Sequence, residues 1–253
     1  MNARLTWQPS LLDAGPDPAI DQTFAAAERV WLDNRSWIER VPGWVSGSDA
    51  LFASLVATAD WGQRTRKMWE NEVVEPRLTS WWGAETGKPL EPAILERMRR
   101  ALSERYGVEF DSMGLNLYRD GRDSVAWHGD RIAREIAEPL VAIVSIGEPR
   151  KFLLRPKAKG TGLPMEHPGD PLGRTTRNPS ARSLRDAPTH RLLLGRGELL
   201  VTGGTTQRAW EHSVPKVASA GPRMSLTFRH GLLPIPGRSL KDSVQTPGGT
   251  LGS

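Results

Sequence analysis

The spacing of apolar residues along the chain changes near residue 108. Before this point apolar residues recur at helical spacing, and after it they alternate or form short runs, which predicts strands. The first predicted helix covers 20–33. Its apolar face carries Ile20, Phe24, Ala27 and Trp31.

Two more helices are predicted from signals at their ends. Ser48 suits the N-cap of a helix that carries Leu51, Phe52 and Leu55. A later helix runs from about Pro92 to Tyr106, because proline is favoured in the first turn and Gly107 suits the position just past the end. Its apolar stripe consists of Ile94, Leu95, Met98 and Leu102.

Short strands are predicted throughout the second half of the chain. Turn residues, such as Asp120-Gly121-Arg122, separate most of them. The predicted strands are 110–119, 124–130, 140–146, 150–154, 191–194, 197–202, 209–214 and 223–230. Many short strands after early helices predict an α+β fold, in which N-terminal helices buttress a β-sandwich or jelly-roll core.

This pattern divides the chain into regions. Residues 1–108 hold the predicted helices, residues 109–236 the predicted core, and residues 237–253 a predicted disordered tail. Within the core, residues 155–190 are rich in Pro, Gly, Ser, Thr and Arg and show almost no apolar periodicity. A loop of this length is functional or disordered. It is therefore either a solvated insertion or a basic flap over a phosphate backbone.

Composition narrows the possible chemistry. The chain has no cysteine, so disulfides, thiolate nucleophiles and cysteine-based metal sites are excluded, and a transition metal must bind to His and carboxylate groups. The formal net charge of +5 favours polyanionic partners. The sequence shows no apolar run of membrane-spanning length and no signal-peptide core at its N-terminus, so we expect a cytoplasmic protein that does not contact membranes.

A candidate metal site can be assembled from the few histidines. In the predicted strand 124–130, His128 and Asp130 stand two positions apart and project from the same face. Sheet pairing could bring in His212 from the predicted strand 209–214. Two histidines and one carboxylate with free coordination positions suit a non-haem Fe(II) oxygenase. An isolated His-x-Asp pair, however, is more often an ordinary surface pair.

A second constellation lies near the C-terminal end of the predicted core. In the segment 223–229, Met224, Leu226 and Phe228 share one face, while the other face carries Arg223, Ser225, Thr227 and Arg229. The polar face either meets solvent or points into a barrel mouth, where two guanidinium groups can hold a dicarboxylate. Asn116 and Tyr118 share parity on an earlier strand and offer neutral hydrogen bonds to the same ligand.

Together these segments resemble the AlkB family of nucleic-acid dealkylating dioxygenases. The resemblance covers about residues 75–231 and keeps the order of the family's motifs. The matching segments are Asn116-Leu117-Tyr118, Gly121 with Asp123, His128-Gly129-Asp130, Ser145-Ile146-Gly147 with Arg150 and Phe152, 197–204, 210–216 and 223–229.

The resemblance implies a double-stranded β-helix that binds Fe(2+) and 2-oxoglutarate. It implies that the catalytic metal ligands are His128, Asp130 and His212. For 2-oxoglutarate, it implies that Arg223 and Tyr118 hold the far carboxylate, and that Asn116 and Arg229 lie near the metal-bound end. Ser225 belongs to the same site, but it stands where many relatives have Asn. The hydrogen bond from this position is therefore expected to be weaker or water-mediated.

The resemblance also implies a substrate-recognition lid before the core. The segment 75–83 looks like this lid, and its candidate substrate-binding residues, together with a nearby tryptophan, are Trp69, Arg77, Trp81 and Trp82. Tryptophan rings could stack on a base that has left its helix, and the arginine could contact the base or a phosphate. Plain core packing is an equally reasonable interpretation of the tandem tryptophans.

The reaction implied is an oxidative demethylation of alkylated DNA or RNA. O2 is consumed, 2-oxoglutarate becomes succinate and CO2, and the alkyl carbon leaves as formaldehyde. We expect a monomer with no protein partner. The main alternative is the same chemistry on a protein or small molecule, which a methyl-lysine peptide assay would distinguish. A nucleic-acid-binding module without turnover is a third, less favoured interpretation.

Overall fold

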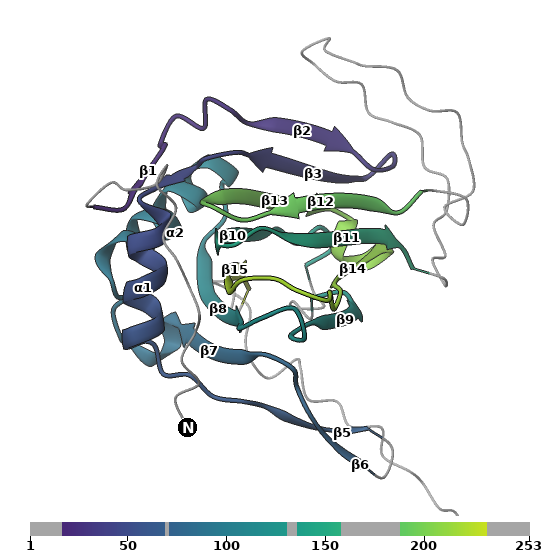
Figure 1. Cartoon of the computed structure of the whole chain (residues 1–253). Coiled ribbons are helices and arrows are strands. Elements are labelled where there is room, and N and C mark those ends of the chain that lie inside the picture. Colours follow the sequence, from purple (N-terminus) through teal and green to yellow (C-terminus); the bar gives the residue numbers. More distant parts are fainter. Residues whose placement is uncertain (1–16, 69–70, 131–135, 158–187, 232–253) are drawn as a thin grey trace, which may run out of the picture.

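Two antiparallel sheets form the centre of the molecule (Figure 1). The computed structural model describes residues 17–68, 71–130, 136–157 and 188–231. The seven-stranded sheet has the order β2 (Glu28–Trp31), β3 (Ser36–Val41), β13 (Glu198–Gly204), β10 (Val141–Gly147), β15 (Arg223–His230), β8 (Phe110–Tyr118) and β7 (Leu78–Gly83). The four-stranded sheet has the order β12 (His190–Leu194), β11 (Arg150–Pro156), β14 (Trp210–Val214) and β9 (Val125–His128).

The chain passes between these two sheets in the manner of a jelly roll. From residue 110 onward, β8, β10, β13 and β15 lie in the large sheet, whereas β9, β11, β12 and β14 lie in the small one. This alternation is that of a double-stranded β-helix, which confirms the expected fold class. The eight predicted strands of the second half all exist, with ends that shift by at most two residues.

Helices cover the outer face of the large sheet. Figure 1 shows α1 (Ser48–Thr58) and α2 (Ala93–Tyr106) side by side against it. One apolar cluster joins the helices to the sheet through Leu51, Phe52, Leu55, Ile94, Leu95, Met98, Leu102, Met224, Leu226 and Phe228. The stripes predicted for both helices and for segment 223–229 therefore do face the core. A second cluster, between the sheets, includes Tyr118, Ile143, Phe152, Leu154, Trp210 and Val214.

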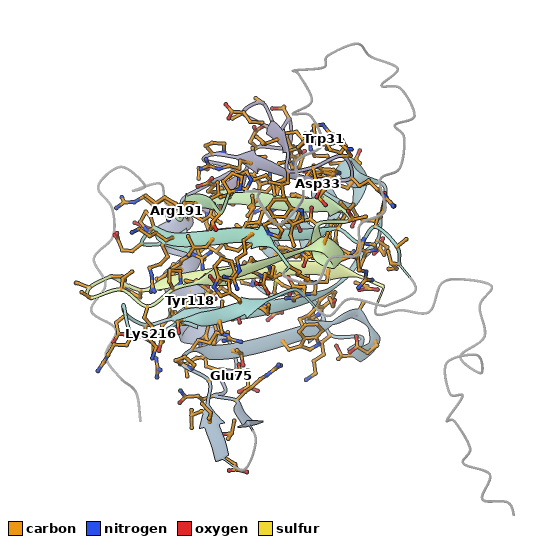
Figure 2. The ribbon with its side chains drawn as sticks, turned by 90° about the vertical axis from the view of Figure 1, so that its right-hand side faces the viewer. Trp31, Asp33, Glu75, Tyr118, Arg191 and Lys216 are labelled. Atoms are coloured by element: carbon orange, nitrogen blue, oxygen red, sulfur yellow. The ribbon has the colours of Figure 1, made fainter. Side chains whose placement is uncertain are left out.

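The remaining elements are small. They are β1 (Ala19–Ile20) paired with β4 (Val45–Ser46), the hairpin of β5 (Thr65–Met68) and β6 (Asn71–Val74), the 3-10 helix η1 (Ala84–Thr86), and α3 (Thr206–Ala209). The hairpin extends away from the body of the molecule in both views (Figures 1 and 2). Among the described helices, none has the length and apolar character needed to span a bilayer.

The prediction of a helix over 20–33 is wrong. Backbone N–H groups of Thr23 and Ala25 donate to the side chain of Asp21 at 2.9 and 2.8 Å. These bonds to the Asp21 side chain give the backbone N–H groups partners outside a helix, so they compete with helix formation. The chain then continues as β2, in which Trp31 is 56% exposed, whereas Phe24 is buried against Trp44. Phe24 and Trp31 therefore do not share one buried face, as an amphipathic helix would require.

The prediction of Ser48 as a cap is also wrong in detail. Helix α1 exists, but Ser48 is its first residue and the N-cap is Gly47, with a left-handed φ of 62°. A Cβ at this glycine would lie 3.0 Å from the carbonyl oxygen of Asp17, so both the backbone angle and the close approach favour glycine. The predicted C-terminal end of α2 is confirmed, with Gly107 as C-cap, whereas Pro92 is the N-cap and the helix begins at Ala93, one residue later than predicted.

Before residue 109, none of the described strands was expected, and neither was η1. Of the strands β1 to β7, three (β2, β3 and β7) belong to the large sheet. Strand β7 pairs with β8 over six residue pairs, from Leu78 opposite Leu117 to Gly83 opposite Ser112. The segment identified as a lid is therefore in part the outermost strand of the core sheet.

Candidate active site

A cavity of about 240 Å³ lies at the mouth of the jelly roll. Its walls come from β7, β8 and β15 of the large sheet and from β9, β11 and β14 of the small sheet. Figure 2 shows Tyr118 within the layered sheets, with Glu75 below it, toward the β5–β6 hairpin. The predicted site residues that line the cavity are Arg77, Trp81, Asn116, Tyr118, His128, Asp130, His212, Arg223, Ser225 and Arg229.

The two predicted histidine ligands meet through strand pairing. His128 ends β9, and His212 lies directly opposite it in the middle of β14. Their ring centroids are 4.3 Å apart. Oδ2 of Asp130, two residues beyond β9, lies 3.8 Å from Nε2 of His212. The structure thus brings His212 to His128 and Asp130, from which the sequence separates it by more than 80 positions.

These three side chains fit a non-haem iron. Nδ1 of His128 lies 2.8 Å from the carbonyl oxygen of Ala126, an acceptor that keeps the proton on Nδ1 and leaves Nε2 as the ligand atom. Oδ2 of Asp130 is buried without a hydrogen-bond partner. Within the described residues, no three His, Cys, Asp or Glu side chains are arranged as a group that could hold a metal ion as they stand. The fit therefore rests on the ligand types and on their shared cavity.

Electrostatics favour the ligand forms of both groups. Burial is the largest effect on the Asp130 carboxyl and opposes its ionisation, but the charges of Arg229 and His212 outweigh it and hold its pKa well below the usual range. Burial also lowers the pKa of His212 to about 4, against the opposing effect of Asp130. At neutral pH the site therefore presents a carboxylate and a neutral imidazole, the forms that bind metals.

Arg223 is a buried cation with free donors. It is 1% exposed, and its Nη2 donates to Oγ of Ser145 at 2.6 Å. Its Nε and Nη1 are buried without hydrogen-bond partners, and its guanidinium carbon lies 5.3 Å from the centroid of the Tyr118 ring. A buried guanidinium with unsatisfied donors is costly unless an anion binds to it. This is the position expected for the far carboxylate of 2-oxoglutarate.

The second arginine of β15 has a different environment. Nη2 and Nε of Arg229 donate to Oδ1 of Asp130 at 2.5 and 3.2 Å. Arg229 thus holds the candidate metal ligand, consistent with its expected place near the metal end. Between the arginines, Ser225 accepts a 3.4 Å hydrogen bond from Nδ2 of Asn116.

The segment before β7 reaches into the same cavity. Nε of Arg77 donates to Oδ1 of Asn116 at 3.0 Å, and its Nη2 pairs with Glu75 at 2.8 Å. Trp81 lines the cavity and is 47% exposed, so part of its ring surface is available to a ligand. Arg64, just before β5, also lines the cavity.

The prediction that Trp82 belongs to the substrate site is wrong. Its indole N–H donates to the carbonyl oxygen of Lys88 at 2.8 Å, and its ring packs against the helix–sheet apolar cluster. Neighbouring residues of a strand face opposite sides, so only one of the tandem tryptophans can face the cavity. Trp69, most of the 155–190 insertion and the predicted tail lie outside the described residues.

Two groups near the site had no assigned role in the sequence. The ring of Phe152 stacks on His212 with centroids 5.0 Å apart, and its place follows from the alternation of β11. Gln207, on the four-residue helix α3, is buried and contacts the backbone of Asp130. The sequence did not indicate a role for Gln207, because a helix of four residues is too short to show a periodic pattern.

A jelly roll that gathers two imidazoles, a carboxylate and a buried arginine at its mouth has the ligand set of a non-haem iron oxygenase. Comparison with known families agrees. The model described as the 2OG-Fe(II) oxygenase superfamily matches residues 62–229, and the chain belongs to this superfamily.

Several relatives carry AlkB-type names. The chain is 32% identical over 200 residues to "Alpha-ketoglutarate-dependent dioxygenase alkB homolog 3" of Bos taurus, a match that covers 74% of this chain and 64% of the relative. It is 41% identical over 124 residues to "DNA oxidative demethylase ALKBH2" of Arabidopsis thaliana, covering 49% of this chain and 38% of the relative. The match thus spans under two thirds of each relative's length.

Proposed function

We propose that this chain is a dioxygenase that uses Fe(II), 2-oxoglutarate and O2 to remove alkyl groups from nucleic-acid bases. The observation that carries the proposal is the buried Arg223, with free donors, in the same cavity as His128, Asp130 and His212. The superfamily and the AlkB-type names of the relatives support it.

Each residue has a proposed role in binding. His128, Asp130 and His212 would hold the iron, while Arg223 would pair with the far carboxylate of 2-oxoglutarate. Tyr118 is buried beside this guanidinium, and burial, opposed by the Arg223 charge, raises the pKa of its phenol. The phenol therefore stays protonated at neutral pH and can donate a hydrogen bond to the same carboxylate.

Bound iron and 2-oxoglutarate would supply, with O2, the oxidising power needed to hydroxylate an N-alkyl carbon, releasing succinate, CO2 and formaldehyde. An N-methyl group offers no acid–base handle, so a redox metal with free coordination positions is the suitable catalyst. The chain's part is to orient these groups and to limit water. Phe152 covers one face of His212, and Ile143 and Val214 add apolar surface to the cavity wall.

The substrate end of the cavity suits a base attached to a phosphate backbone. The exposed face of Trp81 offers a stacking surface, and Arg64 adds a positive charge at the same cavity. A base must leave its stack to enter such a pocket, and aromatic stacking offsets part of that cost. The net charge of +5 favours polyanions as a class.

The test is a panel of 1-methyladenine, 3-methylcytosine and etheno adducts in DNA and RNA, with formaldehyde and succinate measured together. A methyl-lysine peptide serves as the competing substrate. We expect formaldehyde from at least one oligonucleotide and none from the peptide. His212→Ala is the matched inactive control. If this variant turned over at the wild-type rate, the metal assignment would be refuted.

A further inference from the structure

The backbone around Asp130 lacks the support of a strand. Strand β9 ends at His128, and its pairing with β14 consists of Val125 with Val214 and His128 with His212, with a register shift between them. Asp130 lies beyond this ladder, although a metal ligand must be held in place as firmly as its partners. Another group must therefore fix this part of the chain.

Gln207 supplies the missing support. Its Oε1 accepts a 3.0 Å hydrogen bond from the backbone N–H of Asp130. Its Nε2 donates at 2.8 Å to Oγ1 of Thr202, and this second bond fixes which end of the amide faces the metal-ligand segment. Gln207 is 2% exposed and Thr202 is fully buried, so both bonds form away from solvent. A glutamine amide can accept and donate at once, as this position requires.

A lysine fixes the helix that carries the glutamine. Nζ of Lys157, the residue after β11, donates to the carbonyl oxygens of Gln207 and Arg208, each at 3.0 Å. Gly129 packs against this arrangement: a Cβ there would lie 2.9 Å from Nζ of Lys157 and 3.0 Å from the Gln207 carbonyl oxygen. The absence of a side chain at residue 129 thus allows the backbone to approach α3 closely.

The position of α3 explains why the contact between Gln207 and Asp130 matters. Helix α3 leads directly into β14, which carries His212 five residues after Gln207. The helix therefore sits between the two ligand-bearing segments, and its glutamine links one to the other. We infer that Gln207 is a positioning residue that sets the separation of Asp130 from His212 for metal binding. The inference rests on the proposed function, because it assumes that these two residues bind the metal.

Manganese binding, followed by electron paramagnetic resonance without nucleic acid or 2-oxoglutarate, tests this role. Gln207→Met keeps the side-chain length and removes both hydrogen bonds. We expect Mn(II) binding about 10-fold weaker, since loss of a partner that orients a metal ligand costs 10- to 100-fold in affinity. Tyr106→Phe is the matched control, because it loses one buried hydrogen bond, to Glu39, far from the cavity. It should bind Mn(II) as the wild type does.

A second readout does not depend on the metal. Hydrogen exchange of the Asp130 amide in the metal-free protein should be faster in Gln207→Met than in Tyr106→Phe. If Gln207→Met does not fold, Thr202→Val replaces it, because it leaves the glutamine in place and removes the acceptor that orients its amide. Several-fold weaker Mn(II) binding is then expected.

The possible failures are distinguishable. Wild-type Mn(II) affinity and unchanged Asp130 exchange in the substituted proteins would overturn the inference, while the metal site itself stands if His212→Ala loses Mn(II). If the wild type binds no Mn(II), the proposed metal site fails instead. Weakened binding in Gln207→Met with no activity on any oligonucleotide would support the inference and count against the substrate proposal.

Discussion

Nη2 of Arg229 lies 2.5 Å from Oδ1 of Asp130, so the candidate metal ligand is already paired with a cation before any metal binds. Oδ2 of the same carboxylate faces His212 and has no hydrogen-bond partner. One oxygen thus fixes the carboxylate, and the other is free to bind the iron. This division has a measurable consequence for the stability of the metal-free protein.

Arg229→Gln should destabilise the metal-free protein by about 3 kcal/mol, because loss of one partner leaves a buried carboxylate without its cation. Adding Mn(II) should recover part of this loss, since a bound dication replaces the missing charge. Urea unfolding with and without Mn(II) measures both effects. Equal destabilisation in the two conditions would show that the arginine does not act through Asp130.

Arg223→Met should separate stability from function. The variant removes a buried guanidinium whose Nε and Nη1 have no partners, so the ligand-free protein should unfold at the same or a higher urea concentration. Its dissociation constant for 2-oxoglutarate should rise about 100-fold, a loss of roughly 3 kcal/mol for a charged hydrogen bond pair. Calorimetric titration with Mn(II) bound checks the affinity. Unchanged affinity would place the far carboxylate elsewhere.

Trp81→Ala should weaken oligonucleotide binding, whereas Trp82→Ala should lower the stability of the fold. Trp81 is largely exposed at the cavity, so its loss should change stability by less than about 0.5 kcal/mol but weaken binding of a methylated oligonucleotide by about 10-fold. Trp82 packs against the core, so its loss should cost roughly 2–3 kcal/mol of unfolding free energy. Thermal unfolding and fluorescence anisotropy test the pair. A binding defect confined to Trp82→Ala would reverse the assignment.

Glu39 should contribute to acid unfolding. Burial is the largest effect on this carboxyl and opposes ionisation, but hydrogen bonds from Tyr106 and Arg105 and the charge of Arg29 outweigh it and lower its pKa below the ordinary 4.5. A lowered folded pKa means that the stabilisation is full above the unfolded pKa and is lost as the pH falls through the folded value.

Glu39→Gln should therefore be less stable than the wild type at pH 7, and the gap in unfolding free energy should narrow as the pH falls below 4.5 and passes through the lowered folded pKa of the carboxyl. Urea unfolding at several pH values measures it. Tyr106→Phe is a partial control, because it removes one donor to the carboxylate and leaves the arginines in place. A constant gap across this pH range would mean that the carboxylate does not titrate differently in the folded state.

Periodic patterns in the sequence predicted much of the site. Alternation along 223–229 placed Arg223 and Arg229 on one face, and both line the cavity. This result follows from a strand's period of two, which is local and survives in any sheet. His128 and Asp130 also both line the cavity, but Asp130 lies beyond the end of β9, so strand alternation does not account for its position. The meeting of His128 with His212 depends on strand pairing, which the resemblance implied and the structure places.

Side-chain contacts, both local and non-local, limited the rest of the prediction. The side chain of Asp21 bonds to backbone groups that a helix over 20–33 would need, and only the local geometry shows that this turn forms instead. Gln207 acts on Asp130 from 77 positions away, through a helix too short to show a periodic pattern. The tandem tryptophans pointed to one site, whereas strand geometry divides them between two surfaces.

Strand β7, at one edge of the large sheet, connects the proposed substrate end of the cavity to the proposed 2-oxoglutarate end. Thr79 of β7 lies opposite Asn116, which also accepts the hydrogen bond from Arg77. In the proposed function, a shift of this edge strand on binding of an alkylated base beside Trp81 would be passed through this pairing to β8, which carries Asn116 and Tyr118. Substitutions in β7 that widened the range of proposed substrates would then also change the binding of 2-oxoglutarate, and the two properties would evolve jointly.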